Sequence, residues 1–257
     1  NYTSSMYRPI LIKFITIISL FLIAMTVPAP LPFRIEQKKH ARVKAAYSEK
    51  ESSVKTLFKA KGVSYSGFSM ILVGFKAEQK FKVYVRGAKQ KSYSLLKSYD
   101  ICASSGALGP KRREGDLQVP EGLYEVSSFN PQSSYHLSIK VSYPNKSDKV
   151  LSDKKKPGGD IYIHGNCVSI GCIPLTDALI KEIYIMAVET RNAGHKIPVY
   201  IFPFEMTPEN MAVYKMNDGY KKHHLFWDNL QKMYTYWSKN KNEIPYTVDA
   251  KGRYVLR

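Results

Sequence analysis

A histidine and a cysteine eight positions apart are the side chains best suited to chemistry in this sequence. His164 follows the short apolar segment 160–163, and Cys172 lies between Gly171 and Pro174. An imidazole can take the proton of a thiol and later return it to a leaving amine. The glycine leaves space for backbone N–H groups near a developing oxyanion. We therefore expect Cys172 to act as a nucleophile with His164 as its general acid and base.

A helix that follows the cysteine would help to ionise the thiol. Proline is favoured at the first position of a helix, so we expect the helix to begin near Pro174 or Thr176. The unpaired amides at a helix N-terminus create a positive potential, which lowers the pKa of a nearby thiol. The sequence thus predicts a pKa for Cys172 well below the roughly 8.5 of a free thiol.

Two other interpretations of these residues stay open at this point. His164, Cys167 and Cys172 could hold a metal ion, although zinc usually takes four ligands and no second cluster is close in the sequence. Cys167 and Cys172 could instead form a disulfide or be inert buried thiols. The chain has three cysteines, the third being Cys102, so at least one thiol stays free.

The segments that would position the pair indicate an α+β fold, with a β-rich core and helices around it. Helices are expected over 35–61, over 175–192, where one face is apolar, and around 225–237. Apolar or alternating runs predict strands, the first two of them paired in a hairpin. These strands are expected at 68–75, 80–85, 92–103, 124–129, 135–143, 160–163 and 196–202.

The beginning of the sequence has the order of an export signal. Arg8 and Lys13 flank or enter an apolar run over 10–27, which is followed by Pro28-Ala29-Pro30 and a charged stretch. The run is about long enough to cross a bilayer, so an uncleaved inner-membrane anchor is the alternative to a cleaved signal. We assign 1–34 to this membrane-targeting signal or anchor and expect the protein in the periplasm.

The chain is strongly basic, with 39 Lys+Arg against 21 Asp+Glu and a formal net charge of +18. Such a protein is attracted to polyanions, which include nucleic acid, anionic lipid and acidic wall polymers. No zinc-finger spacing, Walker sequence or RNP-like motif favours nucleic acid, and we expect no nucleic-acid partner. A basic surface that is simply solvated is the alternative.

The segment 161–175 resembles the active-site motif of the L,D-transpeptidase catalytic (YkuD) domain, and within that family the YafK-like branch. The branch motif is His-Gly-x-Cys-x-Ser-x-Gly-Cys, and it is matched by His164, Gly165, Cys167, Ser169, Gly171 and Cys172. Other segments that resemble the branch are Gly106–Lys111, Glu114–Asp116, Pro120–Tyr124, Ser134–Ser138 and Tyr143–Asn145.

The resemblance implies a role for each matching position. Cys172 would be the nucleophile, His164 the general acid/base, and the Gly165 carbonyl would orient the imidazole. The amides of Gly171 and Cys172 would form the oxyanion hole, and Cys167 would pack behind the loop. No cofactor and no metal is implied. The resemblance also implies the YkuD-type fold, with an N-terminal helix over 35–61, a catalytic domain over 62–204 and a C-terminal helical appendage over 205–257 packed on it.

One departure from the family pattern leaves the substrate carboxylate without a partner. Many members carry an arginine two residues after the catalytic cysteine, and Pro174 stands there in this chain. We expect His136, in an alternating strand, to be structural. The candidates for substrate binding are Lys111, Arg112, Arg113, Tyr162 and Ser169.

Family members act on the stem peptides of peptidoglycan. The resemblance implies attack on the carbonyl of the diamino acid in these peptides, loss of D-alanine and an acyl-enzyme on Cys172. An amine acceptor would complete L,D-transpeptidation. Water would instead make the protein an L,D-carboxypeptidase, or a hydrolase that trims stem peptides or releases a wall-attached lipoprotein. A wall-binding module without activity and a cysteine protease acting on proteins are rival interpretations.

Overall fold

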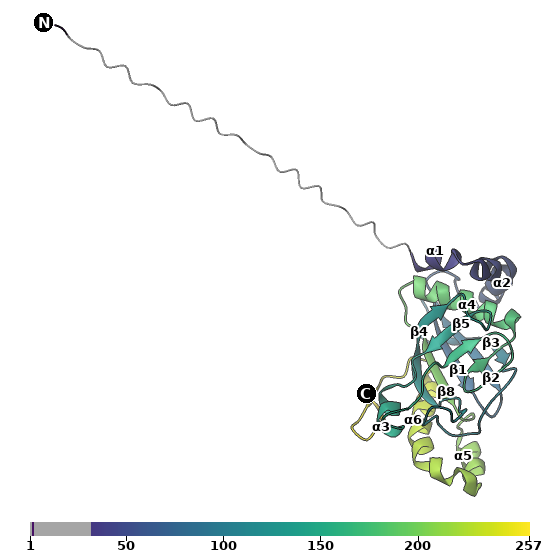
Figure 1. Ribbon diagram of the computed structural model, residues 1–257. Coiled ribbons are helices and arrows are strands. Elements are labelled where there is room, and N and C mark those ends of the chain that lie inside the picture. Colours follow the sequence, from purple (N-terminus) through teal and green to yellow (C-terminus); the bar gives the residue numbers. More distant parts are fainter. Residues whose placement is uncertain (1, 3–31) are drawn as a thin grey trace. The chain divides into compact units, whose positions relative to one another are not determined.

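One mixed sheet of eight strands forms the framework of the protein (Figure 1). The computed structural model describes residue 2 and residues 32–257. The strand order is β3-β2-β1-β8-β4-β5-β6-β7. The strands in chain order are β1 Ser69–Phe75, β2 Lys80–Arg86, β3 Ser94–Asp100, β4 Gly122–Asn130, β5 Ser138–Val141, β6 Tyr162–His164, β7 Ile173–Pro174 and β8 Pro198–Phe202.

The central strand β1 divides the core into two layers. All seven of its residues are buried. Met70 and Leu72 belong to one hydrophobic cluster, whereas Ile71, Val73 and Phe75 belong to the other. This alternation follows from the two-residue period of a strand, whose successive side chains point to opposite faces. The expected hairpin is confirmed, because β1 pairs antiparallel with β2 from Ser69↔Arg86 to Phe75↔Lys80.

Helices α1 (Phe33–Lys38), α2 (Ala41–Ala60) and α4 (Asp177–Asn192) contribute to the first layer. The sequence predicted one helix over 35–61, and the structure has two, because His40 adopts an extended backbone between them. The break lets α1 pack against α4, where Tyr184 Oη donates to Gln37 Oε1 at 2.6 Å. Tertiary contacts here outweigh the local preference for a continuous helix.

The C-terminal residues build the second layer. They form α5 (Pro208–Lys215), the 3-10 helix η1 (Asp218–His223), α6 (His224–Asn240) and the ribbon of β9 (Tyr246–Val248) and β10 (Tyr254–Leu256). Helix α6 buries one face, as an amphipathic helix does. Its buried residues are Trp227, Leu230, Met233 and Trp237. They join the same cluster as Ile71 and Val73 of β1, so the appendage packs directly on the sheet.

The far end of the sheet brings the expected catalytic pair together. Strand β6 ends at His164 and pairs in parallel with β7, with Ile163 opposite Ile173. Cys172 directly precedes β7, so the pairing places it beside the start of β6. Thr176 caps α4 by accepting from the Leu179 amide, and α4 itself begins at Asp177. The short helix α3 (Lys146–Leu151) follows β5.

The expected export segment lies almost entirely outside the described residues. Within the described part of the chain, no helix has the length and apolar character needed to cross a membrane.

The shared core predicts that the appendage and the sheet unfold together. Trp237 is 1% exposed, and its ring lies 5.0 Å from that of Tyr84 and 5.6 Å from that of Tyr200. We expect Trp237→Ala to lower the free energy of unfolding by about 3–5 kcal/mol in one cooperative denaturant transition. Leu225→Ala, at an exposed position of the same helix, should cost less than about 0.5 kcal/mol. A separate early transition in the Trp237 variant would mean that the appendage folds independently.

Candidate active site

His164 ends β6 and is held by the backbone that follows it. The residue is 2% exposed, and its Nδ1 lies 2.5 Å from the carbonyl oxygen of Gly165. When Nδ1 carries the proton it donates to this carbonyl, and Nε2 is then the nitrogen free to accept a proton. The contact expected between the Gly165 carbonyl and the imidazole is therefore present. Its catalytic value stays a prediction.

Gly165 has no room for a side chain. Its amide lies 3.1 Å from the Tyr135 carbonyl oxygen and 3.2 Å from that of Leu137. A β-carbon at this position would lie only 2.5 Å from Asp177 Oδ1. A side chain at this position would push the Gly165 carbonyl, which contacts the imidazole, away from β5 and α4. This explains why a glycine follows the histidine.

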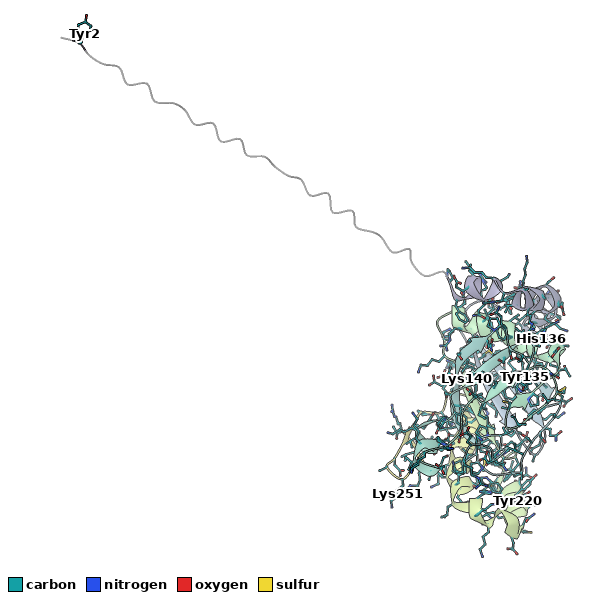
Figure 2. The ribbon with its side chains drawn as sticks, viewed as in Figure 1. Tyr2, Tyr135, His136, Lys140, Tyr220 and Lys251 are labelled. Atoms are coloured by element: carbon teal, nitrogen blue, oxygen red, sulfur yellow. A yellow bond between two sulfur atoms is a disulfide. The ribbon has the colours of Figure 1, made fainter. Side chains whose placement is uncertain are left out.

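Tyr135 covers the imidazole, and the sequence analysis gave it no role. Its ring centroid lies 4.7 Å from that of His164 at an interplanar angle of 34°. The side chain is 42% exposed, and Figure 2 labels it beside His136 and Lys140. The only sequence signal for Tyr135 is its place in the segment Ser134–Ser138.

The thiol of Cys172 is anchored by the backbone next to β6. The Tyr162 amide lies 3.4 Å from Sγ, and Sγ lies 3.6 Å from the carbonyl oxygen of Asp160. Among the residues that the structure describes, no hydrogen bond joins Sγ to His164. Both side chains nevertheless line one pocket of about 240 Å³, together with Tyr135 and Ser169. A catalytic contact that is long in a free enzyme can tighten when substrate binds.

Burial favours the neutral form of both groups. It raises the pKa of Cys172, and the Tyr162 amide, which favours the thiolate, only partly offsets this. Burial also lowers the pKa of His164, against the opposing hydrogen bond to Gly165. The prediction of a depressed thiol pKa is thus wrong. Helix α4 begins at Asp177, five residues after Cys172, and β7 lies between them.

The turn before the cysteine is held by Ser169. Its hydroxyl donates to the Cys172 carbonyl oxygen at 2.9 Å and accepts from the Gly171 amide at 3.2 Å. The Gly171 amide is therefore occupied, whereas the Cys172 amide has no hydrogen-bond partner among the described residues. Gly171 has φ +128°, and a β-carbon there would lie 3.1 Å from the Gln118 carbonyl oxygen. The oxyanion hole predicted from these two amides stays a prediction, with the Cys172 amide as its free donor.

A disulfide links Cys167 to Cys102 across 65 positions of sequence. The interpretation of Cys167 as a packing residue is therefore wrong. Its sulfur is bonded, which also rules out the Cys167–Cys172 pairing and a metal site shared with His164. Cys172 is the free cysteine, in agreement with the odd count. The bond ties the loop between β6 and β7 to the segment after β3.

The substrate-binding candidates lie in different environments. Lys111 is 5% exposed, and its Nζ donates to Asp116 Oδ1 at 2.6 Å and to the Arg113 carbonyl at 2.9 Å. It is therefore committed to its own loop. Arg113 is exposed, and it lines neither of the two pockets that Cys172 lines. Tyr162 offers its backbone amide to the thiol, and Ser169 lines the 240 Å³ pocket.

His136 lies away from the thiol. Its Nδ1 is 3.9 Å from Asp177 Oδ2, and its carbonyl oxygen accepts from Arg42 at 2.8 Å. It lines neither pocket that Cys172 lines. These contacts fit the structural role expected for it.

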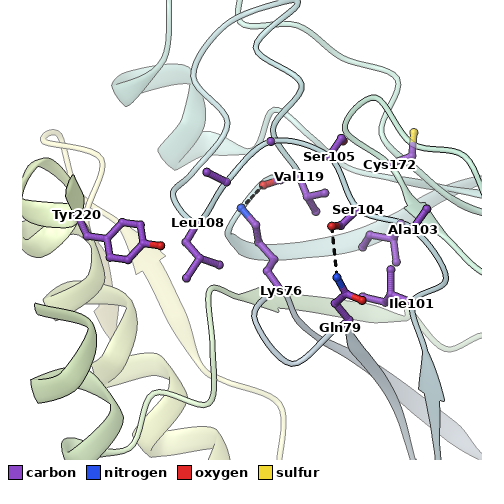
Figure 3. Close-up of a pocket in the computed structure, with 13 residues that line it drawn as sticks. Lys76, Gln79, Ile101, Ala103, Ser104, Ser105, Leu108, Val119, Cys172 and Tyr220 are labelled. Atoms are coloured by element: carbon purple, nitrogen blue, oxygen red, sulfur yellow. Dashed lines mark hydrogen bonds between the residues drawn. The ribbon is translucent and has the colours of Figure 1, made fainter. Parts of the chain in front are cut away.

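Cys172 also lines a second pocket, of about 270 Å³ (Figure 3), and it is the one residue common to the two pockets. Lys76 lines it, but its Nζ already donates to the carbonyls of Gly109 and Val119 and to Glu121, at 2.8–2.9 Å. Tyr220 of η1 closes the end opposite the cysteine, next to Leu108. Sequence reasoning missed Tyr220, because it belongs to the appendage and lies 48 positions after the thiol.

Comparison with known proteins decides the family. The family model described as the L,D-transpeptidase catalytic domain (YkuD) matches residues 69–201. The chain belongs to this family. It is also 38% identical over 186 residues to a protein of Escherichia coli (strain K12) named "Putative L,D-transpeptidase YafK", and the match covers 71% of each chain. The resemblance stated from the motif and the α+β fold class are both confirmed.

Solved structures resemble this YkuD-family chain more distantly. The helical cell shape determining protein Pgp2 (K307A mutant) from Campylobacter jejuni is 23% identical, with a TM-score of 0.44. The match covers 65% of this chain and 59% of that one. L,D-transpeptidase 1 of Mycobacterium tuberculosis is 18% identical, with a TM-score of 0.31 and coverage of 52% and 62%.

The reactivity of the thiol should reflect its burial. We expect the rate of Cys172 alkylation by iodoacetamide to rise with pH along a curve whose midpoint lies above the roughly 8.5 of a free thiol. The same chain, unfolded without reductant, is a matched control, because Cys172 is then its one free thiol with an ordinary pKa. A midpoint in the folded protein at or below that of the unfolded chain would contradict a raised pKa of the Cys172 thiol.

Proposed function

We propose that this protein is an L,D-transpeptidase that cleaves the diamino acid–D-alanine bond of a peptidoglycan stem peptide through an acyl-enzyme on Cys172. The observation that carries the proposal is that Cys172 lines two pockets, of about 240 and 270 Å³, and is the one residue that both share. Transpeptidation needs space for an acyl donor on one side of the nucleophile and for an amine on the other.

Because burial favours a neutral thiol and a neutral imidazole, we infer that Cys172 loses its proton to His164 while its sulfur attacks the substrate. The Cys172 thiol gives its proton to His164 Nε2 while Sγ bonds to the substrate carbonyl carbon, and the Cys172 amide stabilises the oxyanion. Collapse breaks the C–N bond, and the imidazolium returns the proton to the departing D-alanine amine. The acceptor amine then attacks the thioester, gives its proton to His164 and releases the thiolate, which recovers that proton.

This proton exchange assigns the two pockets. The leaving amine and the incoming amine both exchange a proton with His164, so both must approach on the imidazole side. The 240 Å³ pocket contains His164 and is therefore the place for D-alanine and then for the acceptor. The acyl donor then extends from Cys172 into the 270 Å³ pocket, toward Tyr220.

We place the reaction in the periplasm, where peptidoglycan is accessible. Disulfides persist in oxidising compartments and are rare in the cytosol, so the Cys102–Cys167 bond supports this location. The formal net charge of +18 suits an acidic wall polymer.

Mass spectrometry of muropeptide products tests the activity. Incubation with purified tetrapeptide muropeptides should release D-alanine and form a new cross-link from the diamino acid. Cys172→Ala should abolish both products, and His164→Ala should slow them by about 10²–10⁴-fold. His195→Ala, at an exposed histidine after α4, should keep the wild-type rate. D-alanine release without cross-links would make the protein a carboxypeptidase, and a wild-type rate in the His164 variant would overturn the mechanism.

The redox state of the cysteines in cells tests the location. When thiols are blocked in intact cells and the protein is digested without reductant, we expect a peptide pair joined through Cys102 and Cys167, with alkylated Cys172. The joined pair should be recovered from the periplasmic fraction or membrane. In Cys167→Ser, Cys102 should be alkylated as well. Recovery of the protein mainly from the cytosol, with all three thiols alkylated, would argue against export.

A further inference from the structure

A basic cavity adjoins the acyl-donor pocket beyond Tyr220. It has a volume of about 340 Å³ and lies between the loop 107–118 and helix η1. It shares Ala107, Leu108 and Tyr220 with the pocket that reaches Cys172. Figure 3 shows Tyr220 and Leu108 facing each other at the end away from the thiol. A ligand that follows the donor pocket away from Cys172 therefore arrives at this cavity.

The ionisable residues that line the cavity are all basic: Arg112 from the loop, and Lys222 and His223 from η1. The Arg112 guanidinium is fixed by Asp148 Oδ1 at 3.3 Å and by the Phe226 ring at 4.8 Å. These contacts use one of its nitrogens and one of its faces, and its side chain stays 28% exposed. Lys222 is exposed, and no salt bridge joins it to any described residue. The cavity thus offers donors that the fold does not use.

The field at His223 indicates the same preference for an anion. Burial is the largest cause that lowers the pKa of this imidazole, the Glu121 carboxylate opposes it, and the cations of Lys222, Arg112 and Lys76 each lower the pKa by a smaller amount. The Glu121 carboxylate is fully buried. Its oxygens are already bound by Lys76, by the Gly109 amide and by the Trp227 indole. A carboxylate that enters the cavity would meet Lys222, which has no salt bridge among the described residues, and the guanidinium nitrogens that Arg112 does not use for Asp148.

The cavity is built by close packing of its two walls. Gly109 has φ +124°, and a β-carbon there would lie 2.3 Å from His223 Nε2. His223 in turn packs on Trp227, with 5.6 Å between ring centroids. The loop therefore meets the appendage at a glycine, and the side chains of Arg112 and His223 are held beside the cavity.

We propose that this cavity binds a free carboxylate of the wall peptide whose acyl group is transferred to Cys172. The inference rests on the proposed function. This chain has Pro174 where many family members carry an arginine, and we assign the binding of the carboxylate to Arg112 rather than to Lys111 or Arg113. Lys222 and His223 complete the site from the appendage. The C-terminal region is thereby a part of substrate recognition and not only a cover for the sheet.

The first arm of the test changes the enzyme. Lys222→Ala should raise KM for the donor peptide by about tenfold, with little change in kcat, because a charge-assisted hydrogen bond to a remote part of the substrate is lost. Lys221→Ala is the matched control: it removes the same charge from the neighbouring exposed position of η1, and Lys221 does not line the cavity. Equal effects of the two variants would mean that only net charge matters.

The second arm changes the substrate, at constant ionic strength. Synthetic stem peptides in which the free carboxylates are amidated one at a time should include one that the wild type uses about tenfold less well. The same amidation should have a smaller effect on the Lys222 variant, because one of the partners of the carboxylate is already missing. Equal losses in both enzymes for every peptide would overturn the assignment of the cavity.

Equilibrium binding separates this inference from the proposed function. The Cys172→Ala variant cannot be acylated, so calorimetry with the same peptides reports recognition without turnover. Tighter binding of the free carboxylate form, lost in Cys172→Ala/Lys222→Ala, supports the subsite even if the wild type forms no product. Turnover that depends on Cys172 but is indifferent to amidation and to Lys222 would reject the subsite while the transpeptidase activity stands.

Discussion

The buried carboxylate of Glu121 connects three segments around the donor pocket. One of its oxygens accepts from Lys76 Nζ at 2.9 Å and from the Gly109 amide at 2.6 Å, and the other accepts from the Trp227 indole at 2.9 Å. Lys76 follows β1, Gly109 belongs to the loop that lines the pocket, and Trp227 belongs to α6. Removing one partner of such a buried pair typically costs about 3–5 kcal/mol, because the remaining charge is left unpaired. The position of the pocket walls therefore depends on this carboxylate.

Around this centre, the active site relies on backbone groups more than on charges. The imidazole of His164 is oriented by the Gly165 carbonyl, and the thiol of Cys172 lies between the Tyr162 amide and the Asp160 carbonyl. Burial raises the pKa of the thiol and lowers the pKa of the imidazole, so it favours a neutral thiol beside a neutral imidazole over a thiolate–imidazolium pair. In the proposed mechanism, the thiol would react once a bound substrate brings its carbonyl to Cys172.

The disulfide gives the loop between β6 and β7 its second attachment. The loop is held at one end by the pairing of Ile163 with Ile173 and in its middle by the Cys102–Cys167 bond. The Cys102 amide also lies 3.2 Å from the Pro174 carbonyl oxygen. Closing a loop of 65 positions stabilises a protein by about 2–5 kcal/mol in the chain-entropy account, so the bond contributes to stability as well as to the position of Cys172.

The sequence alone determined the fold class, most of the strands, the helix over 175–192 and the two residues, His164 and Cys172, that line one pocket, because these depend on local periodicity and on a short motif. It did not determine which cysteine Cys167 meets, since a disulfide over 65 positions is a property of the folded chain. It gave the wrong direction for the thiol pKa, because burial and the two-residue strand β7 are visible only in three dimensions. Tyr220, Lys222 and His223 come from an appendage that lies far from the motif in sequence, and only the packing of Trp227 on Glu121 brings them to the donor pocket.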